Sequence, residues 1–241
     1  MRTAAIIPAA GRGERLGPGV PKALRELGGA PLLVHAVRAV DRARSVDLVV
    51  VAAPPDDPAA VERLLADYEW IGEVLVVAGG LDRQQSVARA LVSLPEDVDV
   101  VLVHDAARPL APPELVDAVA ATIRRGAAAC VPVVPLADTV KVVADDQVVR
   151  TLDRSSLRAV QTPQGFRRGV LAAAHAAFQQ ALAAGGLPEV PPVTDDAGMV
   201  ERQGVPVVAV PGSEEAFKVT RPLDLLTAEA LLTRRRAAGA R

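Results

Sequence analysis

A loop near the start of the chain combines small residues with cations. It reads Ala-Ala-Gly-Arg-Gly-Glu-Arg-Leu-Gly over residues 9–17 and is followed by Pro21-Lys22. Small residues let a backbone approach a ligand closely, and its amides can hold phosphate oxygens. The loop is neither a Walker A motif nor the dinucleotide-binding fingerprint, because it lacks Gly-Lys-Ser/Thr and its third glycine comes one place late. It predicts an anion site charged by Arg15 and Lys22, with a merely flexible glycine turn as the alternative.

A second glycine pair follows another apolar run. Gly79-Gly80 leads through Asp82 and Arg83 to Ser86, where a helical pattern begins. Glycines again permit close approach to a ligand. The Ser86 hydroxyl has two possible roles, because it could hydrogen-bond the edge of a base or serve only its own backbone.

An acidic residue follows a third apolar run, in His104-Asp105-Ala-Ala-Arg108-Pro109. A carboxylate at the end of a strand, beside a phosphate loop, is a natural ligand for Mg²⁺. The alternative for Asp105 is a structural or helix-capping role. We expect His104 to pack and to donate a hydrogen bond rather than to catalyse.

Three later segments carry further polar residues. Asp-Thr-Val-Lys (138–141) and Asp153-Arg154 flank one stretch, and Thr194-Asp-Asp precedes a short helix for which Thr194 could be only an N-cap. Phe-Lys-Val-Thr (217–220) follows the acidic pair Glu214-Glu215.

The elements that position these residues alternate between strands and helices. Near-continuous apolar runs predict strands buried on both faces. Between four of them, apolar residues at helical spacing follow Pro31, Pro58, Asp82 and Pro112-Pro113. This alternation predicts α/β units around a mostly parallel sheet. The predicted strands are 3–8, 47–53, 73–78, 98–104, 128–134 and 205–210.

One stretch departs from that pattern. Residues 139–143 and 147–152 are rich in valine and flank Ala-Asp-Asp, which predicts a β-hairpin with a polar turn. Because the hairpin comes late in a parallel α/β chain, we expect it to project as an arm.

Composition limits the class of protein. The chain has 241 residues, 50% of them hydrophobic, and 27 Lys and Arg against 29 Asp and Glu give a net charge of −2. This balance favours a well-buried globular protein and gives no sign of nucleic-acid or membrane-surface binding. No apolar run reaches the roughly 20 residues needed to cross a bilayer, and the N-terminal apolar run is too short for a signal peptide. We therefore expect a cytoplasmic protein. The single cysteine, Cys130, excludes an internal disulfide.

Taken in order, these motifs resemble the 2-C-methyl-D-erythritol 4-phosphate cytidylyltransferase family. The first loop alone is typical of sugar-nucleotidyltransferase-like folds, whereas the whole set is specific and spans nearly the whole chain. The matching segments are 8–22, Gly-Gly-x-x-Arg-x-x-Ser-Val (79–87), Val-His-Asp-Ala-Ala-Arg-Pro (103–109), 138–141, Gln-Thr-Pro-Gln-Gly-Phe (161–166), 194–196 and Lys-Val-Thr-Arg-Pro-x-Asp-Leu (218–225).

The resemblance implies a fold, an activity and partners. It implies a single domain over 1–241 with a Rossmann-like nucleotidyltransferase sheet flanked by helices, and an arm over 139–152 that joins two copies as a homodimer. The family transfers a cytidylyl group from CTP to the polyol phosphate in the non-mevalonate isoprenoid pathway and releases pyrophosphate. Mg²⁺ or another divalent cation is the implied cofactor.

The resemblance also implies roles for individual residues. Arg15 and Lys22 would stabilise the transition state, and Arg154 and Lys218 would position the substrate phosphate. Asp105 would hold the metal ion. Relatives often have Asp or Asn shortly before the Lys of Lys-Val-Thr, and here Glu215 is the candidate second ligand. The nucleotide-binding residues would be Ala9, Ala10, Gly11, Gly13, Gly80 and Ser86, with the last two recognising cytosine, and Arg108, Thr139 and Thr194 would contact substrate.

Three other functions remain as alternatives. A ribitol-phosphate or other polyol-phosphate cytidylyltransferase shares the superfamily, and a molybdopterin guanylyltransferase shares the first loop but not the later motifs. A catalytically idle nucleotide-binding module is the third. The presence of Arg15, Lys22 and Asp105 together speaks against it.

Overall fold

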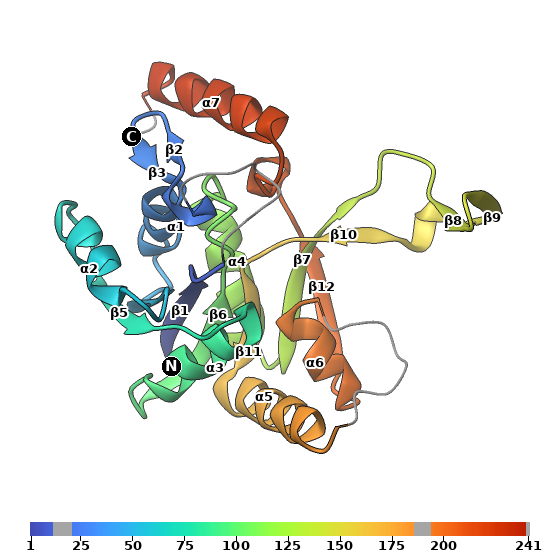
Figure 1. Ribbon diagram of the computed structural model, residues 1–241, viewed down its shortest axis with the longest axis horizontal. Coiled ribbons are helices and arrows are strands. Elements are labelled where there is room, and N and C mark those ends of the chain that lie inside the picture. The colour runs from blue at the N-terminus through green and yellow to red at the C-terminus, as the bar shows by residue number, and fades with distance from the viewer. Residues whose placement is uncertain (12–20, 186–193, 240–241) are drawn as a thin grey trace.

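The computed structural model describes residues 1–11, 21–185 and 194–239. Within them, one mixed sheet forms the centre of the molecule (Figure 1), in the strand order β10-β7-β11-β6-β1-β4-β5, with β12 paired to β7. The neighbours of β1, and β5 beside β4, run parallel as predicted. The sheet strands are β1 (Arg2–Pro8), β4 (Leu48–Ala53), β5 (Glu73–Ala78), β6 (Val98–Val103), β7 (Ala129–Pro135), β10 (Arg158–Val160), β11 (Gln164–Arg167) and β12 (Val207–Pro211).

Two strands of this sheet have no counterpart in the predicted set. Strand β11 is inserted between β6 and β7 and is antiparallel to both, and β10 is antiparallel to β7. Both are short and lack an apolar run, so periodicity gives no signal for them. Their importance is positional, because β11 carries Gln164 into the centre of the sheet.

Helices cover both faces of the sheet. On one face, Ile7 and Leu102 pack with α1, α2 and α4, and on the other, Ile6 and Val101 pack with α3, α5 and α6. Neighbouring residues of one strand point to opposite faces, so β1 and β6 are buried on both sides, as the continuous apolar runs predicted. The helices are α1 (Leu32–Asp41), α2 (Pro58–Ala66), α3 (Arg83–Val92), α4 (Pro113–Arg124), α5 (Arg168–Ala183), α6 (Asp196–Arg202) and α7 (Pro222–Ala237).

The last helix lies over the segment that precedes it. Helix α7 packs near the small β2–β3 hairpin (Glu26–Leu27 and Ala30–Pro31), as Figure 1 shows. Leu27, Val219 and Ala228 are buried together in one apolar cluster. This packing fixes the chain directly beside Lys218.

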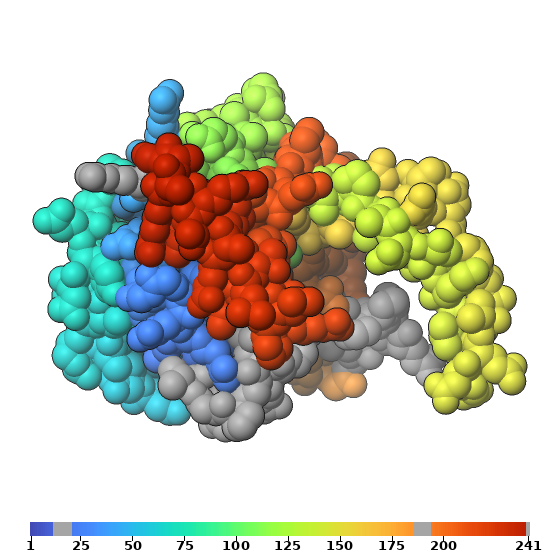
Figure 2. Space-filling model, turned by 90° about the horizontal axis from the view of Figure 1, so that it is seen from above, coloured from blue at the N-terminus to red at the C-terminus, as the bar shows by residue number. Residues whose placement is uncertain are grey.

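The predicted arm is a separate two-stranded hairpin. Strands β8 (Lys141–Ala144) and β9 (Gln147–Thr151) are antiparallel, and the turn residues Asp145 and Asp146 have φ angles of 48° and 61°. Positive φ at both central residues matches the right-handed twist of a tight hairpin. The hairpin projects from the sheet in Figure 1 and stands away from the main body in Figure 2.

Among the described helices, none combines the length and apolar character that a membrane-spanning segment requires.

Candidate active site

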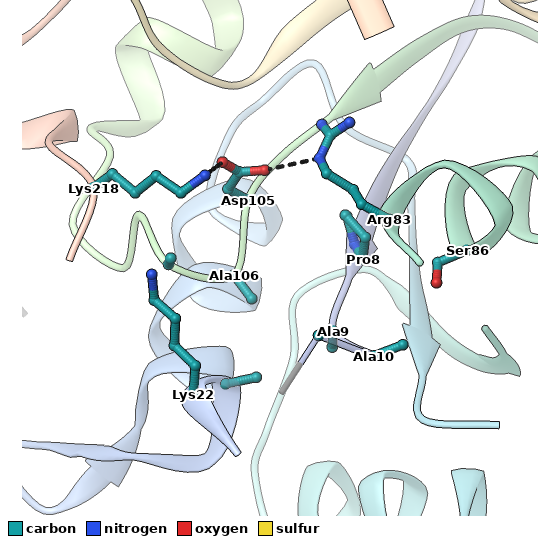
Figure 3. A pocket seen from close by; sticks show the side chains of 12 residues that line it. Pro8, Ala9, Ala10, Lys22, Arg83, Ser86, Asp105, Ala106 and Lys218 are labelled. Atoms are coloured by element: carbon teal, nitrogen blue, oxygen red, sulfur yellow. Dashed lines mark hydrogen bonds and ion pairs between the residues drawn. The ribbon is translucent and has the colours of Figure 1, made fainter. Parts of the chain in front are cut away.

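A cavity of about 190 Å³ opens where β1 and β6 end (Figure 3). Seven of the predicted site residues line it together, drawn from the first loop, the start of α3, the end of β6 and the segment before α7. They are Ala9, Ala10, Gly11, Lys22, Ser86, Asp105 and Lys218, and the wall is completed by Pro8, Ala23, Arg83, Ala106 and Ala107. This is the carboxyl edge of the parallel strands, where open α/β sheets bind ligands. Arg15 and Gly13 lie outside the described residues.

Close contact between two loops shapes one wall of the cavity. The Gly79 amide donates to the Ala53 carbonyl at 2.7 Å. A Cβ atom on Gly79 would stand only 2.6 Å from that carbonyl oxygen and 3.2 Å from the Ala10 Cβ. Glycine is therefore required here for the approach of the loops to each other.

The Ser86 hydroxyl holds the second glycine loop. It donates to the Asp82 carbonyl at 2.7 Å and accepts from the Gly80 amide at 3.0 Å. Asp82 in turn caps α3 by accepting from the Gln85 amide at 2.7 Å. Of the two roles open to Ser86, the structure displays service to the backbone, and recognition of cytosine by Gly80 and Ser86 stays a prediction.

Asp105 lies between two cations. Its Oδ2 is 2.7 Å from Lys218 Nζ, and its Oδ1 is 3.3 Å from Arg83 Nε. Burial acts to raise the pKa of the Asp105 carboxyl, but Arg83 and Lys218 outweigh it and hold the pKa well below its usual value. The carboxylate is therefore ionised at neutral pH.

His104 holds the backbone of Asp105 rather than facing the cavity. Burial lowers the pKa of His104 to about 4, so the ring is neutral at pH 7. Its Nε2 lies 3.1 Å from the Arg108 carbonyl and must donate, which leaves Nδ1 to accept from the Thr162 hydroxyl at 3.2 Å. Thr162 Oγ1 also accepts from the Asp105 amide at 3.0 Å. The prediction that His104 packs and donates a hydrogen bond is confirmed.

The cavity carries an excess of positive charge. Among its described lining residues, Lys22, Arg83 and Lys218 face the single carboxylate of Asp105. Figure 3 shows Lys22 and Lys218 approaching from different sides. A chain of net charge −2 thus concentrates cations at one place, which suits an anionic ligand such as a triphosphate.

Arg108 binds protein backbone and does not line the cavity. Its Nη1 donates to the Ala216 carbonyl at 2.7 Å and its Nη2 to the Val160 carbonyl at 3.2 Å. Burial lowers the pKa of the guanidinium. In this structure the residue predicted to contact substrate connects the segment after β6 with two later segments.

The predicted residues of the arm lie apart from the cavity. Arg154 donates to the Ala137 carbonyl and lines a separate shallow pocket at the base of the hairpin, with Asp153 and Arg158. Thr139 is exposed at the same base. Thr194 is also exposed, and the N-cap of α6 is Asp195 instead.

The structure does not bring Glu215 to Asp105, which differs from the expectation of a second metal ligand. Glu215 Oε1 is 2.8 Å from Arg234 Nη2, and its Oε2 is 3.1 Å from Arg235 Nε. It lines a different pocket, between α1 and α7. The physical reason is that two guanidinium groups of α7 already balance its charge. Among the described residues, no group of three or more His, Cys, Asp or Glu side chains gathers around a possible metal ion.

The Gln161-Thr-Pro-Gln164 segment supports the site, although its residues received no roles from the sequence. Thr162 holds Asp105, as described above. Gln161 exchanges hydrogen bonds with the backbone of Ser213, at 2.8 Å and 3.0 Å, and so holds the segment that leads to Lys218. Gln164 reaches the start of α6. Arg83 was likewise part of a quoted motif without a role, and only its contacts reveal one.

Comparison with known proteins gives a consistent result. The family model described as 2-C-methyl-D-erythritol 4-phosphate cytidylyltransferase matches residues 3–234. A relative of that name from Frankia casuarinae is 61% identical over 97% of this chain and 82% of its own length. Another from Streptomyces coelicolor is 56% identical over 98% of this chain and 86% of its own length.

Solved structures agree with these relatives. The crystal structure of the enzyme of that name from Thermus thermophilus is 36% identical, has a TM-score of 0.75 and aligns over 97% of this chain and 100% of its own. A 4-diphosphocytidyl-2C-methyl-D-erythritol synthase from Anaerococcus prevotii has a TM-score of 0.80 at 29% identity and aligns over 97% and 96%. Sequence motifs, fold and cavity therefore agree, and the chain belongs to the 2-C-methyl-D-erythritol 4-phosphate cytidylyltransferase family.

Proposed function

We propose that the chain transfers a cytidylyl group from CTP to 2-C-methyl-D-erythritol 4-phosphate. The products are 4-diphosphocytidyl-2-C-methyl-D-erythritol and pyrophosphate, which places the enzyme in isoprenoid biosynthesis. The observation that carries the proposal is the meeting of Lys22, Asp105 and Lys218, from three separate family motifs, in one cavity of a chain that matches the family over residues 3–234.

The chemistry needs charge stabilisation more than a base. An oxygen of the acceptor phosphate attacks the α-phosphorus of CTP, a new P–O bond forms, and the bond to the β-phosphate breaks as pyrophosphate leaves. The attacking phosphate is already ionised at pH 7. The barrier comes from bringing two anions together and from charge on the leaving group, so positioned cations lower it.

The described cations suit those two tasks. Lys22 extends from the first loop, where Gly11 and the alanines let a triphosphate approach the backbone. Lys218 is held by Asp105 at 2.7 Å and has a 38% exposed side chain, so its ammonium is oriented but still reachable by a phosphate. The neutral His104 ring is used up in structural hydrogen bonds, consistent with a reaction that needs no protein base.

The donor set fits a magnesium ion that arrives with the nucleotide. Mg²⁺ usually binds one or two carboxylates together with substrate phosphates, and Asp105 supplies one ionised carboxylate at the cavity wall. When bound, such an ion would neutralise charge on the triphosphate. In this role Asp105 would hold the ion, and Lys22 and Lys218 would bind the phosphates around it.

A homodimer through the arm is the second part of the proposal. A lone two-stranded hairpin is marginal in water, and Val143, Val148 and Val149 on the arm are more than half exposed. The side chains of Thr139 and Arg154 lie at the arm's base and do not line the cavity of their own chain. They would serve the site of the neighbouring subunit. A cytoplasmic location stays a prediction.

The experiment is an assay of pyrophosphate release in the presence of MgCl₂, with each of four nucleoside triphosphates and with or without methylerythritol phosphate. We expect release with CTP only when the acceptor is present. Release that ignores the acceptor, or that is faster with GTP, would contradict the proposal. The second pattern would favour a guanylyltransferase.

A further inference from the structure

Behind Asp105, a line of ionic contacts runs into the interior. Arg83 Nε lies 3.3 Å from Asp105 Oδ1, and Arg83 Nη1 lies 2.7 Å from Asp196 Oδ2. Asp196 Oδ1 is then 2.9 Å from His175 Nε2. We call Asp105, Arg83, Asp196 and His175 the charge chain. It joins four elements that lie far apart in the sequence: the end of β6, α3, α6 and α5.

The inner half of the charge chain is sealed from solvent. The Asp196 side chain is 0% exposed and that of His175 is 4% exposed. Burial acts to raise the pKa of Asp196, but Arg83 and His175 outweigh it and lower the pKa, so this carboxylate stays ionised. Burying an ionised carboxylate is costly, and well-packed apolar residues generally serve a fold at least as well. The position of this charge therefore calls for a role beyond packing.

The backbone around Asp196 is held in place. Gln164 donates from Nε2 to Asp195 Oδ2 at 2.6 Å and accepts at Oε1 from the Ala197 amide at 3.1 Å. Asp195 caps α6 by accepting from the Gly198 amide at 2.9 Å. The start of α6 is thus tied to the central strand β11, and Asp196 points from it to Arg83 with little freedom.

Arg83 carries this constraint to the cavity. Its backbone sits in the first turn of α3, which Asp82 caps, and its guanidinium contacts one carboxylate through Nε and the other through Nη1. A planar guanidinium held at two nitrogens has a fixed orientation. Figure 3 shows Arg83 and Lys218 on opposite sides of the Asp105 carboxylate. Lys218 is the more exposed of the two, so Arg83 is the fixed support.

We propose that Asp196 and His175 are positioning residues for cytidylyl transfer: they fix Arg83, and Arg83 fixes the Asp105 carboxylate at the cavity. The inference rests on the proposed function. It assigns a task to two buried residues that touch neither the cavity nor the substrates, and it makes the effect of Asp196 depend on Asp105.

A double-mutant cycle tests that dependence. Asp196→Asn keeps the size of the side chain but removes its charge, and we expect it to lower kcat by about tenfold or more with a smaller change in KM for CTP. In an Asp105→Asn background, the same substitution should lower kcat no further, because its route to the reaction is already lost. Losses that multiply in the double variant would overturn the proposal.

A matched control separates positioning from stability. Asp41 is also a buried carboxylate, and it accepts from the Ile71 and Gly72 amides at 2.8 Å, far from the cavity-lining residues. Asp41→Asn should lower the melting temperature but leave kcat unchanged. An Asp196→Asn variant that behaves in the same way would reduce Asp196 to a structural residue.

Binding gives a readout that does not depend on turnover. Titration calorimetry with CTP, in the presence and absence of MgCl₂, should show that Asp196→Asn and Asp105→Asn lose the same Mg²⁺-dependent part of the affinity, whereas Asp41→Asn keeps it. A wild-type-like gain from MgCl₂ in Asp196→Asn would overturn the proposal.

A milder pair of variants covers the case in which Asp196→Asn does not fold. His175→Ala should lower kcat, and His175→Gln should restore it, because the glutamine amide can donate where Nε2 now contacts Asp196. Equal kcat in the two variants would contradict the positioning role. Absence of any transfer by the wild-type protein would overturn the proposed function together with this inference, whereas an active wild type with multiplying losses would overturn the inference alone.

Discussion

Lys218 Nζ lies 2.7 Å from Asp105 Oδ2, so a cation of the last motif is joined to the carboxylate at the end of β6, 113 residues earlier. The contact brings the final segment of the chain to the same cavity as the first loop. It also sets the ionisation of Asp105, because Lys218 and Arg83 together overcome the effect of burial on its pKa. The loss of either cation is therefore felt at the carboxylate as well as at the substrate.

Removal of the first-loop cation should affect catalysis and not folding. We expect Lys22→Ala to lower turnover by about 10²–10³, the usual cost of losing one preorganised electrostatic contact. Arg63→Ala, which removes an exposed cation of α2 outside the cavity, is the control and should keep wild-type turnover. Steady-state kinetics and circular dichroism measure the two properties. Normal turnover of folded Lys22→Ala would show that this lysine is only a solvated loop charge.

The contact between the glycine loops predicts a sensitive position. A methyl group on Gly79 would clash with the Ala53 carbonyl oxygen at 2.6 Å, so Gly79→Ala should lower the free energy of unfolding by about 1–3 kcal/mol. It should also raise KM for CTP, because the loop beside Ala10 must shift. Gly169→Ala is the matched control, since nothing lies within 4 Å of its Cβ position. Equal denaturant midpoints for the two variants would contradict this role of Gly79.

The buried His35 predicts a pH dependence of stability. Burial is the main cause that lowers its pKa below the ordinary value of 6.5, Arg38 and Arg236 lower it further, and the hydrogen bond to the Leu27 carbonyl opposes them. The unfolded state therefore takes up a proton first as the pH falls, and this group costs stability from the unfolded pKa downward until the folded pKa is passed.

His35→Gln should weaken that dependence. Glutamine can still donate to Leu27 but does not titrate. Urea unfolding at about pH 7.5 and about pH 5, on either side of the ordinary histidine pKa, should show a smaller loss of stability for the variant than for wild type. An identical loss in both proteins would assign the acid sensitivity to other groups.

The arm predicts complementation between two inactive variants. If Arg154 serves the neighbouring site, a mixed dimer of Lys22→Ala with Arg154→Ala contains one site with both substitutions and one intact site. Each variant alone should be nearly inactive, and verified mixed dimers should recover activity. A monomer in sedimentation, or no recovery in verified mixed dimers, would refute the arrangement.

The sequence predicted the parts of the fold that have strong periodicity. The strands ending at Pro8 and Val103 and the hairpin around Asp145 were found because continuous apolar runs and a polar turn are local signals. Strand β11 was not predicted, because Gln-Gly-Phe-Arg carries no periodic pattern and its place between β6 and β7 is decided by tertiary contacts.

The same division applies to the site. Lys22, Asp105 and Lys218 were identified from motifs, and the cavity unites them. Glu215 was chosen for its place in the chain, yet its partners Arg234 and Arg235 come from a helix that no short-range pattern connects to it. Asp196 belongs to a quoted motif, but only three-dimensional contacts reveal that it stands behind Arg83.

The cavity between Lys22 and Lys218 should join CTP to one particular acceptor. This is measured most directly as pyrophosphate release from CTP with methylerythritol phosphate or ribitol 5-phosphate as acceptor, with the nucleotide product identified by mass spectrometry. We predict 4-diphosphocytidyl-2-C-methyl-D-erythritol and a kcat/KM for the erythritol substrate far above that for ribitol phosphate. Equal turnover with ribitol phosphate, or no product from the erythritol substrate, would contradict the assignment.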